Sequence, residues 1–214
     1  MNDDWPVEWA GVTESVTTTL GPNDRWNVAA LGLRAPAGAE TETGDGDAGR
    51  ASADIGRKGP VTATTWGNTR TRRNFEREGG GVVQFVTDPR DFVDAALSVR
   101  EEDDPVLDSA AAWVHVDAER LASETVEGTV KERWALEPTA STVRERRVPT
   151  VDRGFAAVVD ATVAASRLDV ESYETDDLLD RLEYFAGVVD SCGGPRVREA
   201  FARVDEYADW RDRR

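Results

Sequence analysis

The hydrophobic pattern of the chain changes once, near residue 150, and this change constrains the fold more than any other feature. Before it, runs rich in β-branched residues alternate with turn signals: residues 12–20 end at the turn Gly21–Asp24, and residues 26–33 follow. This spacing predicts a β-hairpin. After it, from Arg153 on, apolar residues recur at helical spacing. We therefore expect a β-rich part followed by a helical part.

The remaining elements follow from the same patterns. Further strands are predicted over residues 60–66, 81–87, 112–116 and 126–136 and near Val143, and helices over residues 71–78, 88–97, 153–166, 173–189 and 196–210. Residues 101–105 are predicted to be an acidic loop, and residues 35–53, which lack apolar periodicity, a mobile acidic insertion. The expected architecture is α+β, with a six- or seven-stranded antiparallel barrel in residues 1–150 and a helical segment in residues 151–214.

The charge of the chain is strongly negative. Of its 214 residues, 42 are Asp or Glu and 26 are Lys or Arg, which gives a formal net charge of −16, and only Lys58 and Lys131 are lysine. Dispersed carboxylates suit a protein that stays hydrated in strong salt, where the Debye length is about 3 Å at 1 M. We expect a halophilic host; the even spread of acid disfavours the alternative of one acidic face for a basic partner. The charge also argues against nucleic-acid binding.

Other function classes are excluded by what the chain lacks. No apolar run is long enough to span a bilayer and no secretory signal is recognisable, so a cytoplasmic protein without a membrane partner is expected. His115, the only histidine, lies in a strand-like run, and Cys192, the only cysteine, precedes Gly193 at a predicted helix end. A metal site built on His or Cys and a Ser-His-Asp triad are therefore not expected.

Residues 68–79 carry the pattern of a phosphate site. Arg70, Arg72 and Arg73 lie in a polar turn and the start of a short helix, which ends at Gly79 before an apolar strand. The first turn of a helix offers free N–H groups and the positive end of its dipole, and guanidinium groups bind phosphate through paired hydrogen bonds. The pattern predicts a phosphorylated ligand. The alternative is that these arginines only pair with carboxylates of the same helix.

The order of several motifs resembles the flavin reductase-like, FMN-binding split barrels. Three motifs carry the likeness: the strand 27–33, the polar strand end 64–68, and the helix pattern Thr71-x-x-Asn74-Phe75 with its following strand 81–85. Gln84 is a mild departure, because the family often has Asn one strand later. The resemblance implies an antiparallel split β-barrel that binds FMN.

The C-terminal part resembles one branch of these proteins. Residues 152–167 and Cys192-Gly193-Gly194 are similar to the C-terminal region of an archaeal branch of unknown function, whose members look like FMN-binding homodimers. Split barrels usually bind flavin in a groove between subunits. The resemblance therefore implies a homodimer with the flavin at the subunit interface.

The resemblance also gives each part of the candidate site a role. Arginines and short polar side chains would bind the phosphate, main-chain N–H groups of residues 27–32 would meet the ring edge, and one tryptophan would stack on the ring. The residues expected to bind the cofactor are Asn27, Ala29, Gly32, Trp66, Asn68, Thr69, Arg70, Thr71, Arg72 and Asn74. Arg73 is assigned to the solvent side of its helix, and Trp113 and Trp134 to the core or an interface.

The function expected from these features is FMN binding, in the form of a flavin-dependent oxidoreductase with a small-molecule electron donor or acceptor. No side chain stands out as an acid or a base, so no catalytic residue is assigned. A non-catalytic flavin carrier or sensor, and a split barrel that binds a deazaflavin or haem, remain alternatives. A subunit contact, a second phosphate contact and plain surface remain open for Arg144, Arg146 and Arg147. For Arg153 and Arg167 the resemblance implies a place facing the flavin cleft of a neighbouring subunit, and ion pairing with Asp152 or Asp160 is the alternative.

Overall fold

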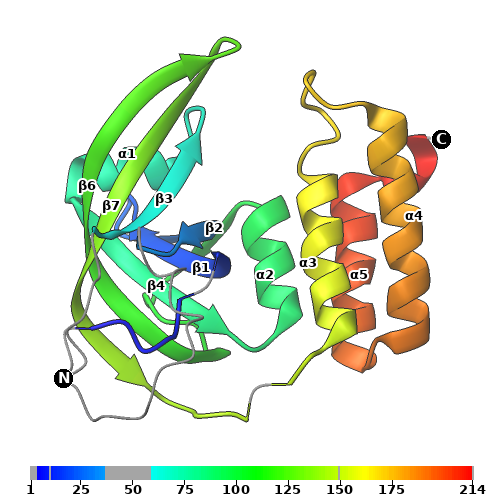
Figure 1. Ribbon diagram of the computed structural model, residues 1–214, viewed down its shortest axis with the longest axis horizontal. Coiled ribbons are helices and arrows are strands. Elements are labelled where there is room, and N and C mark those ends of the chain that lie inside the picture. The colour runs from blue at the N-terminus through cyan, green and yellow to red at the C-terminus, as the bar shows by residue number, and fades with distance from the viewer. Residues whose placement is uncertain (1–3, 10, 37–58, 149, 214) are drawn as a thin grey trace, which may run out of the picture.

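The protein is a closed antiparallel β-barrel with a helical layer on one side (Figure 1). The computed structural model describes residues 4–9, 11–36, 59–148 and 150–213. Within them, a seven-stranded sheet runs in the order β1-β4-β6-β7-β3-β2-β5, and an additional β1–β2 pairing closes the barrel. The strands are β1 (Val12–Leu20), β2 (Trp26–Arg34), β3 (Val61–Trp66), β4 (Gly80–Val86), β5 (Arg100–Glu102), β6 (Ala110–Val126) and β7 (Thr129–Val143). The predicted fold class, a split barrel followed by helices, is confirmed.

The hairpin of β1 and β2 forms as predicted, with Val12 opposite Arg34 and Leu20 opposite Trp26. The predicted acidic insertion at residues 35–53 lies outside the described residues from residue 37 onward. The predicted loop at residues 101–105 is wrong at its start, because β5 pairs there with the first residues of β2. Pairing with the edge of a distant strand gives this acidic stretch its extended form, and its own composition does not indicate it.

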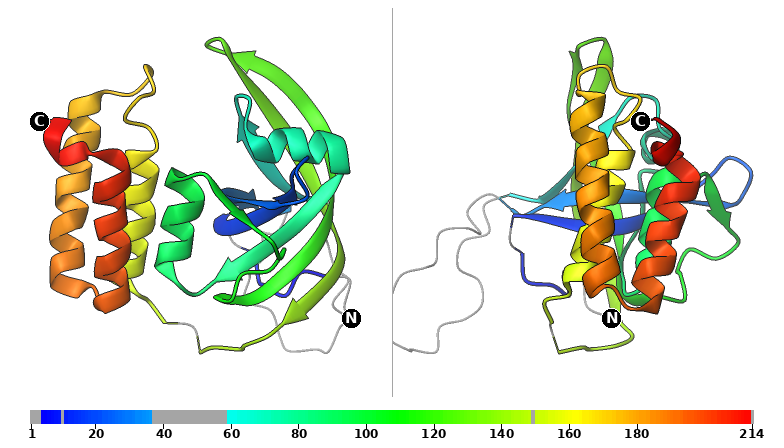
Figure 2. Two further views of the ribbon diagram at one scale, coloured as in Figure 1. Left: turned by 180° about the vertical axis from the view of Figure 1, so that it is seen from behind. Right: turned by 90° about the vertical axis from the view of Figure 1, so that its right-hand side faces the viewer.

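The hairpin of β6 and β7 is longer than predicted and extends beyond the barrel (Figure 2). The sequence predicted one strand over residues 126–136, but a tight turn at Glu127 and Gly128, with φ values of 48° and 80°, interrupts this range. Positive φ at both central residues is typical of a type I′ hairpin turn. The far half of β6 is exposed on both faces, so it lacks the alternation by which a strand is recognised.

Helix α1 (Arg70–Glu78) closes one end of the barrel. Its N-cap is Thr69, whose hydroxyl accepts a hydrogen bond from the Arg72 amide, and it ends at Gly79 in the left-handed conformation. Phe75 is 1% exposed and packs in the barrel core, with its ring centroid 5.3 Å from that of Trp134. This buried face fixes which way the first turn of α1 points.

Helix α2 (Pro89–Leu97) lies between the barrel and the remaining helices (Figure 1). Phe92 and Ala95 pack against Val16 and Val28 of the barrel, whereas Val93 belongs to the core of the helical layer. That layer consists of α3 (Arg153–Ala165), α4 (Thr175–Cys192) and α5 (Pro195–Ala208), followed by a 3₁₀ turn, Trp210–Arg213. Residues of α2 belong both to the core of the helical layer and to the cluster that packs on the barrel. The division of the chain into two domains near residue 150 therefore stays a prediction. No helix in the described part of the chain is long and apolar enough to cross a membrane.

Candidate functional site

A cavity of about 720 Å³ lies where the helical layer meets the barrel. Its walls come from β2, the end of β3, the first turn of α1, the barrel-facing side of α2 and the C-terminal end of α3. Small-molecule sites are concave spaces of about 300–1,000 Å³ with apolar walls and a few polar groups. The cavity has the size and the composition of such a site.

Most residues predicted for the cofactor site line this one cavity. They are Asn27, Ala29, Gly32, Trp66, Asn68, Thr69, Arg70 and Thr71. Arg72 and Asn74 do not line it. Asn74 is buried, and its amide donates to the Thr19 hydroxyl at 2.9 Å, so it fastens α1 to β1.

The first turn of α1 forms the cationic end of the cavity. Amides in this turn have no partner within a helix, so the N–H groups of Arg70 and Thr71 are available to a ligand. The guanidinium of Arg70 lines the cavity and contacts the Glu101 carboxylate at 2.6 Å. Arg73 lines it too, donates to the Asn68 carbonyl oxygen at 3.1 Å, and makes no ion pair among the described residues.

Arg72 and Arg73 thus differ from what the sequence predicted. Arg73 is exposed, as expected, but its side chain also belongs to the cavity wall. Helical spacing could have predicted that Arg73 lies with Arg70, because residues three apart in a helix share a face and residues two apart do not. Arg70 and Arg73 therefore point to the same side, and Arg72 points elsewhere.

The side chain of Arg72 is held by a buried carboxylate. Glu132 of β7 is 1% exposed, and its oxygens accept from Arg72 Nε at 2.9 Å, Arg120 Nη1 at 3.2 Å and the Ser123 hydroxyl at 3.2 Å. Arg72 also lies 3.5 Å from Glu76. The cluster ties α1 to the β6–β7 hairpin and holds the first turn in place beside the cavity.

The middle of β2 presents an open backbone edge to the cavity. On one side β2 pairs with β1 over its whole length. On the other side, among the described residues, it pairs with β5 only at residues 26–28 and with β3 only at residues 33–34. Residues 29–32 line the cavity between these two partners. Since a strand without a neighbour leaves N–H and C=O groups unpaired on that side, this gap is suited to the polar edge of a planar ligand.

The walls from α2 and α3 were not predicted. They comprise Phe92, Ala95, Ala96, Ser98 and Val99 from α2 and its end, and Thr162, Val163 and Ser166 from α3 and its end. Val99 is 74% exposed. The hydrophobic pattern of α3 predicts a helix but does not indicate that its end lies against the barrel of its own chain.

Glu14 of β1, opposite Gly32, is an acidic group at the rim of this cavity. Desolvation raises the pKa of its carboxyl above the ordinary value; the charge of Asp160 adds to the increase, and Arg167 opposes it. Glu14 was not singled out in the sequence, because its environment is made by α3. Among the described residues, the other ionisable side chains of the lining are Arg70 and Arg73.

The three tryptophans considered for the site or the core lie in different environments. Trp134 is 2% exposed in the barrel core, which confirms its predicted place. Trp66, predicted to stack on a ring, lines the cavity with 51% of its surface exposed, and Lys131 Nζ lies 5.4 Å from its ring centroid. Trp113 is half-buried beneath the Arg144 guanidinium, 4.9 Å away.

Several other polar residues have structural partners. Arg144 also donates to the carbonyl oxygen of Asp108 at 2.8 Å, and Arg147 pairs with Glu145 at the surface. Gln84, the departure from the family pattern, is fully buried and binds the Thr18 hydroxyl at 3.1 Å. In the part of the chain that the structure describes, no group of three or more His, Cys, Asp or Glu side chains could hold a metal ion.

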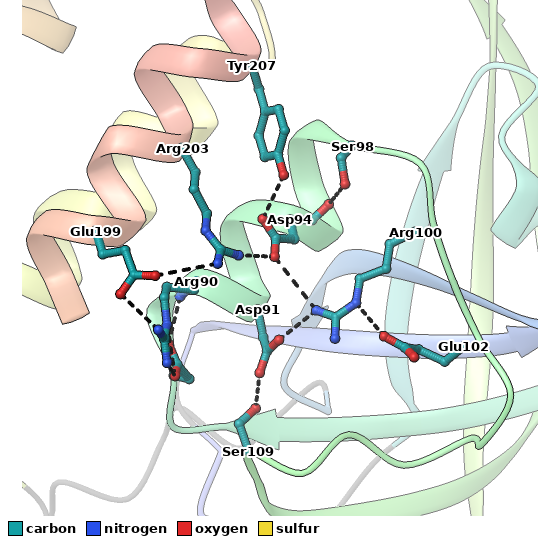
Figure 3. Close-up of polar contacts among 11 residues, drawn as sticks. Arg90, Asp91, Asp94, Ser98, Arg100, Glu102, Ser109, Glu199, Arg203 and Tyr207 are labelled. Carbon is teal, nitrogen blue, oxygen red and sulfur yellow. Dashed lines mark hydrogen bonds and ion pairs between the residues drawn. The ribbon is translucent and has the colours of Figure 1, made fainter.

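A polar network on the other side of α2 connects the cavity wall to the helical layer (Figure 3). Arg100 of β5 contacts Asp91 at 2.6 Å and Glu102 at 2.7 Å. Asp94 accepts from the Tyr207 hydroxyl at 3.0 Å and pairs with Arg203, both on α5. These contacts hold α2, β5 and α5 together behind the cavity.

Comparison with solved structures supports the fold. The crystal structure of an FMN-bound protein of Methanosarcina mazei has 20% identity and a TM-score of 0.68, over 94% of this chain and 96% of that one. The flavin reductase of styrene monooxygenase from Pseudomonas putida has 16% identity and a TM-score of 0.36, over 64% of this chain and 82% of that one. Flavoredoxin from Methanosarcina acetivorans has 11% identity and a TM-score of 0.33, over 64% and 72%.

Comparison with family models covers most of the chain. A search of curated proteins finds no match. Residues 13–145 match the N-terminal domain of a protein of unknown function, DUF447, and residues 152–206 match the second model of that family. The two matches follow one another in the order of the barrel and the helical layer. The chain therefore belongs to the DUF447 family of proteins of unknown function.

Proposed function

We propose that this protein binds FMN in the cavity between the barrel and the helical layer. The observation that carries the proposal is that one cavity joins a cationic helix N-terminus to an unpaired strand edge. FMN has the matching parts, a dianionic phosphate at one end and a flat ring with polar edges at the other. The related Methanosarcina mazei protein, which shares the fold at 20% identity, is FMN-bound.

The residues of the cavity fit this cofactor part by part. The phosphate would be bound by the N–H groups of Arg70 and Thr71 and by the Arg73 guanidinium. The ring edge would meet the open backbone of residues 29–32. A side chain at Gly32 would project beside Glu14, with its Cβ 3.4 Å from Oε1, so glycine keeps this part of the wall clear. Phe92, from α2, supplies apolar surface to the ring.

We further propose that the protein is a flavin-dependent oxidoreductase. When bound, the flavin ring supplies the transfer of a hydride or of electrons. The protein's own residues bind the phosphate, orient the ring along β2, and exclude water through the walls from α2 and α3. Burial raises the pKa of the Glu14 carboxyl at the rim. No residue is assigned to the chemical step itself.

We also infer the setting in which the protein works. Dispersed carboxylates and a net charge of −16 support a salt-accumulating archaeal host with the protein in its cytoplasm. The β6–β7 hairpin extends past the barrel, and we propose that a second copy of the chain covers it in a homodimer. The electron donor and acceptor would be small molecules that enter beside the flavin.

The test is purification in molar KCl, followed by the absorption spectrum and titration with FMN. A yellow protein, or an apo form that takes up one FMN per chain, is expected. Unchanged flavin fluorescence and melting temperature on addition of FMN would refute the proposal. Steady-state reduction by NADH or NADPH then distinguishes an oxidoreductase from a non-catalytic flavin carrier, because a carrier holds FMN without turnover. Uptake of a deazaflavin in preference to FMN would show that the cofactor is a deazaflavin and not FMN.

A further inference from the structure

Strand β5 presents its side chains to two different places. Successive residues of a strand point to opposite sides. Arg100 and Glu102 point into the network behind α2, in which Arg100 is held by Asp91 and Glu102 (Figure 3). Glu101, between them, points to the opposite side and contacts Arg70, a residue of the cavity wall. The strand thus places one carboxylate beside the cationic end of the cavity.

Glu101 is fixed at this position by more than one contact. Its Oε1 lies 2.6 Å from Arg70 Nη1, and its Oε2 accepts from Asn23 Nδ2 at 3.1 Å. Its main-chain carbonyl accepts from Arg25 Nη2 at 3.1 Å, and its backbone pairs with Asn27 of β2. The carboxylate therefore has a second partner, Asn23, and the backbone that carries it is held beside Arg70 by β2 and Arg25.

We propose that Glu101 is a built-in competitor for the phosphate of the ligand, an inference that rests on the FMN function proposed above. A phosphate that binds Arg70 must displace this carboxylate or share the guanidinium with it. In either case the dianion comes close to a fixed negative charge. Glu101 thus weakens the binding of phosphorylated flavins and favours their release, whereas it has no such effect on riboflavin, which carries no phosphate.

The competition has a consequence for how the flavin is used. A flavin bound by Arg70 without a competitor would dissociate slowly, as a permanently held group does. With Glu101 present, bound and free FMN exchange more readily. This behaviour suits a protein that exchanges its flavin with free flavin in solution.

The test compares Glu101→Gln with Glu102→Gln. Both substitutions remove one carboxylate charge from β5, but the side chain of Glu102 points away from the cavity towards Arg100. FMN and riboflavin dissociation constants are measured by flavin fluorescence at the lowest salt in which the protein is folded. We expect Glu101→Gln to tighten FMN binding about fivefold, the scale of one partly exposed ion pair, and to leave riboflavin unchanged. Glu102→Gln should change neither ligand.

A second background locates the effect at Arg70. In Arg70→Ala, Glu101→Gln should tighten FMN binding less than it does with Arg70 present, because competition for the cation is gone and only repulsion between carboxylate and phosphate remains. Weaker FMN binding by Glu101→Gln would mean that Glu101 orients Arg70 for the phosphate, and it would overturn the inference. Equal effects on FMN and riboflavin, an equal effect of Glu102→Gln, or an unchanged FMN constant would also overturn it, while leaving FMN binding intact. If the wild-type protein binds neither flavin, the proposed function fails and this inference fails with it.

Discussion

Arg73 is the residue at which phosphate binding can be tested most directly. Among the described residues it is the cavity-lining arginine without a carboxylate partner, and its guanidinium donates to the Asn68 carbonyl oxygen. A phosphate would therefore gain its charge-assisted hydrogen bonds without the loss of an existing ion pair. Arg70, in contrast, gives up or shares Glu101 when it binds the same phosphate.

The magnitudes follow from this difference. A hydrogen bond to a charged group contributes about 1.5–3 kcal/mol, and partial exposure of Arg73 places its effect in the lower half of that range. Arg73→Ala should weaken FMN binding about ten- to thirtyfold. Arg70→Ala should cost less, about two- to fivefold, because the lost contact replaces an ion pair that already exists.

The assay is a fluorescence titration of each variant with FMN and with riboflavin. Both arginine variants should reduce the preference for FMN over riboflavin, since only FMN carries the phosphate. Arg77→Ala is the matched control: it removes the same charge from the same helix, but Arg77 pairs with Glu78 and does not line the cavity. If Arg73→Ala weakens FMN no more than Arg77→Ala does, or weakens both flavins equally, the phosphate is not bound at this turn.

Three further predictions concern stability. With a net charge of −16, the melting temperature should rise from dilute buffer into molar KCl, and a flat or falling value would contradict the halophilic interpretation. Glu132→Gln should lower the free energy of unfolding by about 2 kcal/mol in urea denaturation, because it leaves Arg72 and Arg120 without their shared buried carboxylate; a loss below about 0.5 kcal/mol would mean that the cluster contributes little. Because the folded-state pKa of Glu14 lies above its ordinary value of 4.5, its ionisation disfavours the folded state, so the stability present below that value is lost as pH rises through the folded pKa. Glu14→Gln should therefore stabilise the protein at neutral pH and have little effect below pH 4.5, and an equal effect at both pH values would contradict the argument.

Much of the fold could be predicted from local pattern. The change of hydrophobic period near residue 150, the turn at residues 21–24 and the short helix ending at Gly79 each depend on residues close together in the chain, and the elements form where predicted. The phosphate motif is local as well, because free N–H groups belong to the first turn of any helix. The elements that were missed, β5 and the far half of β6, form through pairing with other strands, and their own residues carry no alternation.

The partners of the arginines were decided only by the tertiary structure. Arg72 reaches a carboxylate 60 residues away, and Arg70 one 31 residues away. Local pattern extends about four residues along a helix, so it can tell that Arg70 and Arg73 share a face but not what that face meets. The sequence by itself determined a β-barrel, a helical segment and a cationic turn. The folded chain decided that α2 and α3 close the cavity, that Glu132 holds Arg72 and that Glu101 contests Arg70, because each of these contacts joins segments that only the barrel brings together.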